Sequence, residues 1–294
     1  MTTRLFQRVS RVVISRNQAT TDERRFFKPL PDGIEVTQLR TRFEIEKSLE
    51  PSPNTCTLQI DNLSPTTRAE LQNPGIVVKL EAGYDSAPRH MFVGDLTWAR
   101  STQEDNEWVT ELALGDGARA YANARRNRSY AGGTQIINVL RDAATSMGVS
   151  LPPEIERAPE FREQFSAGFA TTGRVRDELT RLLAPYGYGW SIQNGRLQIL
   201  RDEDALGTSR LVAEETGMIG SPEFDKPAQR KSRRSQKYRG AKATVKMFLY
   251  PELTPGHHVE IRSRALNGIF KIYRVKHEGD THGDPWTTEI EVHA

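Results

Sequence analysis

Cysteine is nearly absent from this chain, whose 294 residues include only Cys56. A single cysteine cannot form an intramolecular disulfide, and it excludes a metal site built from several thiolates. Long apolar runs are also missing, so the sequence predicts no transmembrane helix and no membrane insertion. The first residues, MTTRLFQRVSRVVISRN, place charges within every apolar stretch and do not resemble a secretory signal. We expect a protein that is made in a reducing cytoplasm.

Motifs of the common enzyme classes are missing as well. The chain has neither the nucleophile elbow G-x-S-x-G nor the phosphate-binding loop G-x-x-x-x-G-K-S/T. The segments GYGW and GDGARA begin like a dinucleotide fingerprint, but both lack its third glycine. Paired carboxylates cannot be picked out among 38 acidic residues, because their pairing depends on the fold. The sequence therefore predicts no catalytic residue and no bound cofactor.

Strand-like runs fill the first part of the chain. Hydrophobic residues make up 36% and charged residues 27%, while a formal net charge of +3 does not by itself indicate nucleic-acid binding. Alternating apolar residues predict strands within 5–16 and 34–49. A short helix is expected to begin at Pro65, with Ser64 as its N-cap. We interpret residues 1–118 as a first β-barrel-like domain.

The pattern changes in residues 119–205. Apolar residues at helical spacing predict helices at about 134–147 and 174–184. Farther on, Asn194-Gly195 lies between two alternating runs, which is the strongest short signal for a β-hairpin. This part is predicted to be a small α+β domain of helices and a hairpin.

Strand-like runs return in residues 206–294, interrupted by a basic segment at 226–242 that has no acidic residue. The residues of this segment that could contact an acidic partner are Arg230, Lys231, Arg233, Arg234, Lys237 and Arg239. We interpret the segment as a mobile surface loop, with contact to nucleic acid or to an acidic subunit as the alternative. Because Tyr238 is its only aromatic residue, specific recognition of bases is not expected.

The two ends of the chain resemble each other. Three pairs of segments match: WVTELAL (108–114) with WTTEIEV (286–292), VKL (78–80) with VEI (259–261), and Phe92 with Phe270, each phenylalanine sixteen residues before its tryptophan. We infer an internal duplication, which makes residues 206–294 a second β-barrel-like domain. The predicted fold is thus mainly β, with two similar barrel-like domains flanking an α+β domain.

The segment KHEGDTHGDPW, residues 276–286, could be read as a metal site or as a polar turn. Its histidines, His277 and His282, are five residues apart rather than the four that a helical zinc motif requires, and Gly279 also disfavours a helix. With the same offset as the tryptophan motifs, His277 falls on Ala99, so the loop chemistry differs while the flanking strands agree. We predict a connection between two strands and no metal site.

Several longer motifs resemble baseplate hub proteins of long-tailed bacteriophages. The segments that carry the resemblance are FEIEKSLEPSPNTCTLQIDNLSPTTRAEL (43–71), VKLEAGY with FVGDL (78–96), GRVRDELTRLLAPYGYGWSIQNGRLQIL (173–200), TGMIGSPEF (216–224), LYPELTPGHHVEI (249–261) and NGIFKIYRVKHEGDTHGDPWTTEIEV (267–292). The basic segment at 226–242 departs from the pattern of the family, so no role is carried onto it.

The resemblance implies a structural role in the virion, at the tail baseplate. Such hubs form a homotrimeric ring that joins the hexameric tail tube to a trimeric spike, contacts other baseplate proteins and frames the channel through which DNA leaves without specific recognition. Two like β domains per chain would give a trimer near-sixfold symmetry on one face. The alternatives are a tail-associated cell-wall hydrolase, the hub of a contractile secretion system, whose chains usually continue into a spike, and a DNA-binding module using the loop at 226–242.

Overall fold

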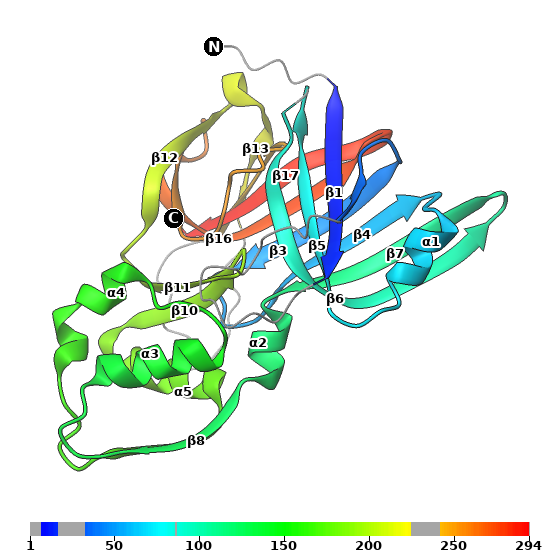
Figure 1. Ribbon diagram of the computed structural model, residues 1–294. Coiled ribbons are helices and arrows are strands. Elements are labelled where there is room, and N and C mark those ends of the chain that lie inside the picture. The colour runs from blue at the N-terminus through cyan, green and yellow to red at the C-terminus, as the bar shows by residue number, and fades with distance from the viewer. Residues whose placement is uncertain (1–6, 17–32, 86, 225–241, 294) are drawn as a thin grey trace, which may run out of the picture.

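The computed structural model describes residues 7–16, 33–85, 87–224 and 242–293, and strands dominate these ranges, which confirms a mainly β fold (Figure 1). The first β unit comprises β1 (Arg8–Arg16), β2 (Ile34–Val36), β3 (Thr41–Ser48), β4 (Asn54–Asp61), helix α1 (Pro65–Glu70), β5 (Ile76–Tyr84), β6 (Arg89–Glu104) and β7 (Glu107–Asp116). The helix begins as predicted, because the Ser64 hydroxyl accepts a hydrogen bond from the Thr67 backbone N–H at 3.1 Å and Pro65 occupies the first turn.

The middle unit combines helices with short strands. It comprises α2 (Ala118–Asn123), β8 (Arg125–Tyr130), α3 (Ile136–Ser146), α4 (Pro153–Arg157), η1 (Pro159–Arg162), β9 (Phe169–Arg174), α5 (Val175–Leu183), η2 (Ala184–Tyr186), β10 (Tyr188–Gln193) and β11 (Arg196–Arg201). The predicted hairpin is confirmed: Asn194 and Gly195 connect β10 to β11 with φ angles of 52° and 75°, as a two-residue turn of this type requires. The unit has its own core, in which the rings of Tyr121 and Trp190 stack at 5.3 Å.

The second β unit contains the rest of the described chain. Its elements are β12 (Leu206–Ala213), η3 (Glu214–Thr216), β13 (Met218–Phe224), β14 (Lys242–Phe248), β15 (His257–Arg262), β16 (Asn267–Asp280) and β17 (Gly283–His293). Strand β16 is long enough to pair with three neighbouring strands. Its first part pairs with β15, and its second part lies between β17 and β3. It therefore joins the second β unit to the first.

One continuous sheet of thirteen strands runs through both β units, in contrast to the two separate barrels expected from the sequence. Its order is β13-β14-β17-β16-β3-β4-β7-β6-β5-β1-β2, with β15 beside β16 and β12 beside β15. Among the described strands this path does not return to its start, so neither barrel closes. The reason lies in β3, whose outer edge pairs with β16 of the other unit rather than with a strand of its own.

The two β units share one strand order. The neighbours β5-β6-β7-β4-β3 in the first unit correspond to β15-β16-β17-β14-β13 in the second, with β1 beside β5 and β12 beside β15. All pairs within these two series are antiparallel, whereas β1 is antiparallel to β5 and β12 is parallel to β15. The shared order is what an internal duplication predicts, and it extends beyond the segments that match in sequence.

The register of the pairing corrects one part of the sequence alignment. Leu96 lies opposite Leu114, and Ile272 lies opposite Val292, with a bulge immediately after each pair. Leu96 is therefore the counterpart of Ile272, and the equal Phe–Trp spacing does not mark equivalent phenylalanines. The offset changes because β17 carries Asp284 and its following proline before the tryptophan, whereas β7 has no such insertion. In this register the counterpart of His277 is a serine, not Ala99.

Candidate functional site

The residues singled out by sequence as contacts for an acidic partner lie outside the described part of the chain. This holds for Arg230, Lys231, Arg233, Arg234, Lys237 and Arg239. The last residue of the same segment, Lys242, begins β14, and its ammonium group lies 2.7 Å from the Glu291 carboxylate. The role of the basic segment therefore remains a prediction.

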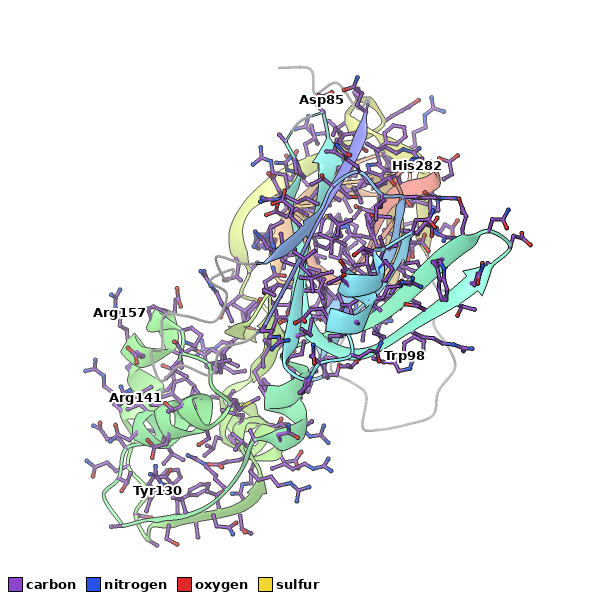
Figure 2. The ribbon with its side chains drawn as sticks, turned by 45° about the vertical axis from the view of Figure 1, so that its right-hand side comes forward. Asp85, Trp98, Tyr130, Arg141, Arg157 and His282 are labelled. Atoms are coloured by element: carbon purple, nitrogen blue, oxygen red, sulfur yellow. The ribbon has the colours of Figure 1, made fainter. Side chains whose placement is uncertain are left out.

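The histidine-containing segment forms the end of β16, a tight turn and the start of β17. His277 is fully buried, and its Nδ1 lies 2.8 Å from the Thr288 hydroxyl. Burial lowers the pKa of His277 to about 3, so the ring is neutral. His282 is exposed at the turn (Figure 2). Within the described residues, no three His, Cys, Asp or Glu side chains are grouped as metal ligands.

The β3–β16 junction, defined by the pairing of Arg42–Ser48 with Arg274–Asp280, joins the two β units. On its inner face Ile45 lies opposite His277, and both are fully buried. On its outer face the Lys276 ammonium lies 3.5 Å from the Glu44 carboxylate. Main-chain pairing, a buried inner face and an ion pair outside together hold the units in register.

The tip of the β16–β17 hairpin is also anchored on the first β unit. The Arg40 guanidinium donates two hydrogen bonds to the Asp280 carboxylate, at 2.7 and 3.1 Å. Trp286 is 3% exposed and lies in the core of the first unit, where its ring meets that of Phe43 edge-on at 5.5 Å. A Cβ atom on Gly279 would lie 2.3 Å from the Phe43 ring, so this close approach requires glycine.

A buried polar joint fixes the middle unit to the sheet. Its centre is Asp116, which is fully buried at the end of β7 and accepts hydrogen bonds from the backbone N–H groups of Asn194 and Gly195, the latter at 2.8 Å. Asn54 donates from its side-chain amide to the Ile192 carbonyl at 2.9 Å. The turn predicted by Asn-Gly is thus also the docking point of the hairpin. The segment GDGARA contains this aspartate, and its structural role was missed by sequence reasoning.

Lys47 supplies the positive charge of the joint. It is 2% exposed, and its ammonium group donates to the Asn194 side-chain oxygen at 3.1 Å. Burial lowers the pKa of Lys47 to about 8 and raises the pKa of Asp116 to about 6, while the attraction between the two charges opposes both shifts. Between these values both groups are charged, so the joint holds a compensated pair at neutral pH.

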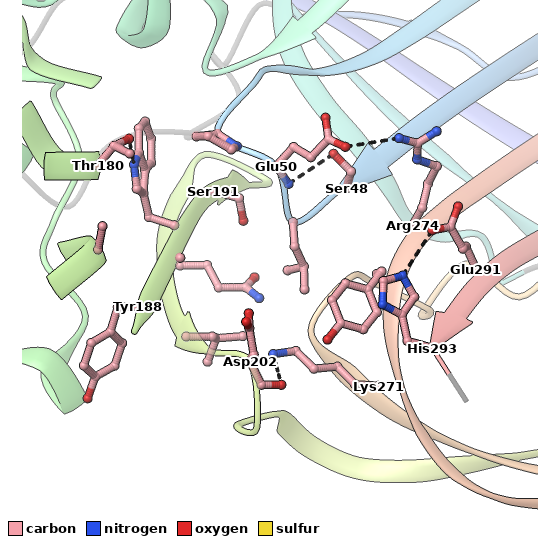
Figure 3. A pocket seen from close by; sticks show the side chains of 18 of the residues that line it. Ser48, Glu50, Thr180, Tyr188, Ser191, Asp202, Lys271, Arg274, Glu291 and His293 are labelled. Atoms are coloured by element: carbon pink, nitrogen blue, oxygen red, sulfur yellow. Dashed lines mark hydrogen bonds and ion pairs between the residues drawn. The ribbon is translucent and has the colours of Figure 1, made fainter. Parts of the chain in front are cut away.

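A cavity of about 230 Å³ lies where the middle unit meets both β units (Figure 3). The Lys271 ammonium donates to the backbone carbonyls of Arg201 at 2.7 Å and Asp202 at 3.3 Å. On the neighbouring strand β17 the Glu291 carboxylate lies 3.4 Å from His293, and this bond is the main cause that lowers the pKa of Glu291 to about 2. The Lys271, Glu291 and His293 side chains are therefore held by neighbouring groups of the protein at the seam between units.

Exposed apolar side chains are concentrated on the two β units. The large ones among the described residues are Trp98, Trp108, Ile219, Phe224, Phe248 and Ile269. Three of them lie on β13 and on the part of β6 beyond Asp95, each of which has no described strand along one edge. Figure 2 shows Trp98 on the β6–β7 hairpin, whose end projects beyond the rest of the sheet in Figure 1. Exposed apolar groups along open strand edges indicate surfaces for binding other chains.

Comparison with known proteins yields matches in structure only. No family model and no curated protein sequence matches the chain. A 43 kDa tail protein of prophage MuSo2 from Shewanella oneidensis shares the fold with a TM-score of 0.64 at 10% identity, covering 96% of both chains. The tail protein from Neisseria meningitidis MC58 has a TM-score of 0.63 at 12% identity, covering 97% of this chain and 96% of its own.

A third structure extends the likeness to a secretion machine. The E. coli c3393 protein, a component of the type VI secretion system with structural similarity to the T4 tail proteins gp27 and gp5, has a TM-score of 0.56 at 11% identity. The match covers 86% of this chain and 73% of that one. None of the helices in the described part of the chain has the length and apolar character needed to span a bilayer. The chain has the fold of phage tail proteins, in agreement with the hub resemblance seen in its sequence.

Proposed function

We propose that this protein is the structural hub of a phage tail baseplate. Three copies form a ring that joins the hexameric tail tube to the trimeric spike and frames the channel for DNA. The observation that carries the proposal is the shared strand order of the two β units within one continuous sheet. Three chains with two like units each present six similar modules, which can meet a sixfold partner on one face and a threefold partner on the other.

The proposed domains are 1–118, 119–205 and 206–294, with the first and third forming the ring. The middle domain is then an attachment that the buried polar joint holds at a fixed angle. The partners are the protein itself, the tube protein, the spike protein and other baseplate proteins. DNA passes through the ring without specific recognition. The protein resides in the virion tail after synthesis in the host cytoplasm.

The oligomeric state tests this proposal. Light scattering of the purified chain is expected to give the mass of three protomers of 33.2 kDa each. Images of the particles are expected to show threefold symmetry, with six similar densities in one layer. A chain that stays monomeric at micromolar concentration and in the presence of the tube protein contradicts the proposal.

We also predict that the chain has no hydrolase activity. Lys242, Lys271, Glu291 and His293, which line its cavity between units, are bound to one another or to backbone carbonyls, and this leaves them poorly placed for general acid–base chemistry. Incubation of the purified protein with peptidoglycan is expected to release no soluble fragments above a buffer control. Clear turnover by this chain alone would instead support the cell-wall hydrolase.

A further inference from the structure

We propose that the open edge of β13 in one copy pairs, antiparallel, with the outer half of β6 in the next copy of the same chain. This contact repeats between chains the β3–β16 junction that is seen within one chain. The inference rests on the proposed trimeric hub and names the surfaces that would close its ring. Its occupant is a second copy of this chain, since the internal junction supplies the pattern for both edges.

Both edges are open among the described strands. Strand β6 pairs with β5 only as far as Asp95, so the stretch Leu96–Glu104 has β7 on one side and no described strand on the other. Strand β13 pairs with β14 alone. The counterparts of β6 and β13 are the two strands of the β3–β16 junction, because β6 corresponds to β16 and β13 corresponds to β3 in the shared strand order. The open edges of β6 and β13 therefore correspond to the edges of β16 and β3 that are paired with each other within the chain.

The register of β6 follows from its partner β7. Ser101 lies opposite Thr110, and His277 lies opposite Thr288. Because these two threonines occupy the same place in the matching tryptophan motifs, Ser101 is the counterpart of His277. Thr102 is then the counterpart of Glu278.

The register of β13 follows from its partner β14. Ile45 lies opposite Cys56 on β4, and Phe224 lies opposite Ala243 on β14. Cys56 and Ala243 in turn lie opposite residues of β7 and β17 that occupy the same place in the two tryptophan motifs. Phe224 is therefore the counterpart of Ile45. A bulge in β13 ends at Glu223, and the match holds for Glu223 and Phe224 beyond it.

The combined register places Phe224 opposite Ser101 of the next copy, because Ile45 lies opposite His277 in the junction. The exposures agree with this assignment. Ile45 is 0% exposed under β16, whereas Phe224 in the same position is 46% exposed. Among the described residues Phe224 thus lacks the cover that Ile45 has, and an added strand would supply it.

The charges agree as well. In the junction the Lys276 ammonium lies 3.5 Å from the Glu44 carboxylate. The counterparts of these residues are Arg100 and Glu223, both of which are exposed. The sign of each charge is kept although the residue at the basic position differs. Arg100 of one copy is therefore expected to face Glu223 of the next.

The two edges differ from each other, so the contact is head to tail rather than symmetric. Contacts of this kind close into a ring when the rotation between neighbours divides a full turn, and otherwise they form a filament. In a trimer, three contacts between chains would alternate with three junctions within chains. Six contacts of one kind around the axis account for a pseudo-sixfold ring.

A disulfide trap tests the register directly. Directly opposed residues of antiparallel strands have Cα atoms about 4.5–5.5 Å apart, which suits a disulfide. The doubly substituted chain Ser101→Cys, Phe224→Cys is expected to give covalent dimers and trimers on oxidation, which disappear on reduction. The native Cys56 is buried, and burial raises its pKa, so it does not compete. The single variant Ser101→Cys is the control and is expected to stay largely uncrosslinked.

Charge reversal tests the contact without a covalent bond. Arg100→Glu alone and Glu223→Arg alone place like charges together, which is expected to raise the dissociation constant of the trimer at least about tenfold. The double reversal is expected to restore assembly to near the native level. Arg157→Glu, on the exposed side of the middle unit, is the matched control and is expected to change nothing.

The outcomes separate this inference from the proposed function. A trimer that forms normally, gives no crosslink and ignores both reversals leaves the hub in place and overturns the edge pairing. A chain that never trimerises overturns both. Crosslinks and rescue by the double reversal support both.

Discussion

Replacing Trp286 by alanine is expected to lower the free energy of unfolding by about 3–5 kcal/mol, the range for large aromatic side chains removed from a core. The indole is 3% exposed and lies between the rings of Phe43 and Tyr84, at centroid distances of 5.5 and 6.5 Å. It belongs to the second β unit but fills the core of the first. Its loss therefore weakens both units and the contact between them.

Urea unfolding followed by circular dichroism and by fluorescence measures this effect. Trp108→Ala is a matched control, because Trp108 occupies the corresponding place in the first β unit but is 37% exposed and covered mainly by the Arg68 guanidinium at 3.8 Å. It is expected to cost about 1 kcal/mol or less. Trp286→Phe keeps an aromatic ring and removes an indole N–H that has no hydrogen-bond partner among the described residues, so it is expected to cost less than alanine. If Trp286→Ala and Trp108→Ala lowered the free energy of unfolding equally, the proposed role of Trp286 in holding the two β units together would be contradicted.

Replacing Asp116 by alanine is expected to cost about 2–4 kcal/mol, because two backbone N–H groups of the Asn194-Gly195 turn lose their acceptor inside the protein. Lys47 at the same time loses its nearby negative charge. The middle unit is expected to loosen from the sheet before either unfolds. Hydrogen exchange checks this, since the amides of Asn194 and Gly195 should lose protection while the core of the middle unit keeps its own.

The same aspartate predicts a pH dependence. Its pKa is raised to about 6 in the folded protein, so its contribution to stability is complete below its ordinary value near 4 and is lost as the pH rises through 6. Relative to Asp116→Asn, the native chain is expected to lose up to about 3 kcal/mol between pH 4 and pH 7. Unfolding midpoints of both proteins across this range provide the measurement. Parallel pH profiles would show that Asp116 does not titrate in this interval.

Local features were predictable from the sequence because a few neighbouring residues determine them. Ser64 and Pro65 predict the start of α1, and Asn194-Gly195 predicts the turn of the β10–β11 hairpin. Helices α3 and α5 of the middle unit follow from apolar residues at helical spacing, whereas the short helices α2 and α4 were not predicted. Each of these elements satisfies its own backbone groups nearby, so little outside information is needed.

Long-range pairing could not be predicted in the same way. The β3–β16 junction pairs residues such as Ile45 and His277, and the sequence of neither strand indicates which strand it pairs with. Which edge remains available depends on where β5 stops along β6 and where β15 stops along β16. The role of Asp116 was hidden for the same reason, since its partners lie in a turn nearly eighty residues away. The alignment of Phe92 with Phe270 failed because the insertion before Trp286 changes the offset between the two hairpins, which only the strand register shows.

The position of β16 has a consequence for synthesis. Residues 41–48 leave the ribosome early, but the strand that covers their edge is completed only at Asp280. A growing chain therefore carries one uncovered edge of β3 until β16 has been synthesised, and a product that ends before β16 keeps this edge uncovered. Such fragments expose a strand edge to which other chains can add and are expected to aggregate, so correct folding of the first β unit depends on the later synthesis of β16.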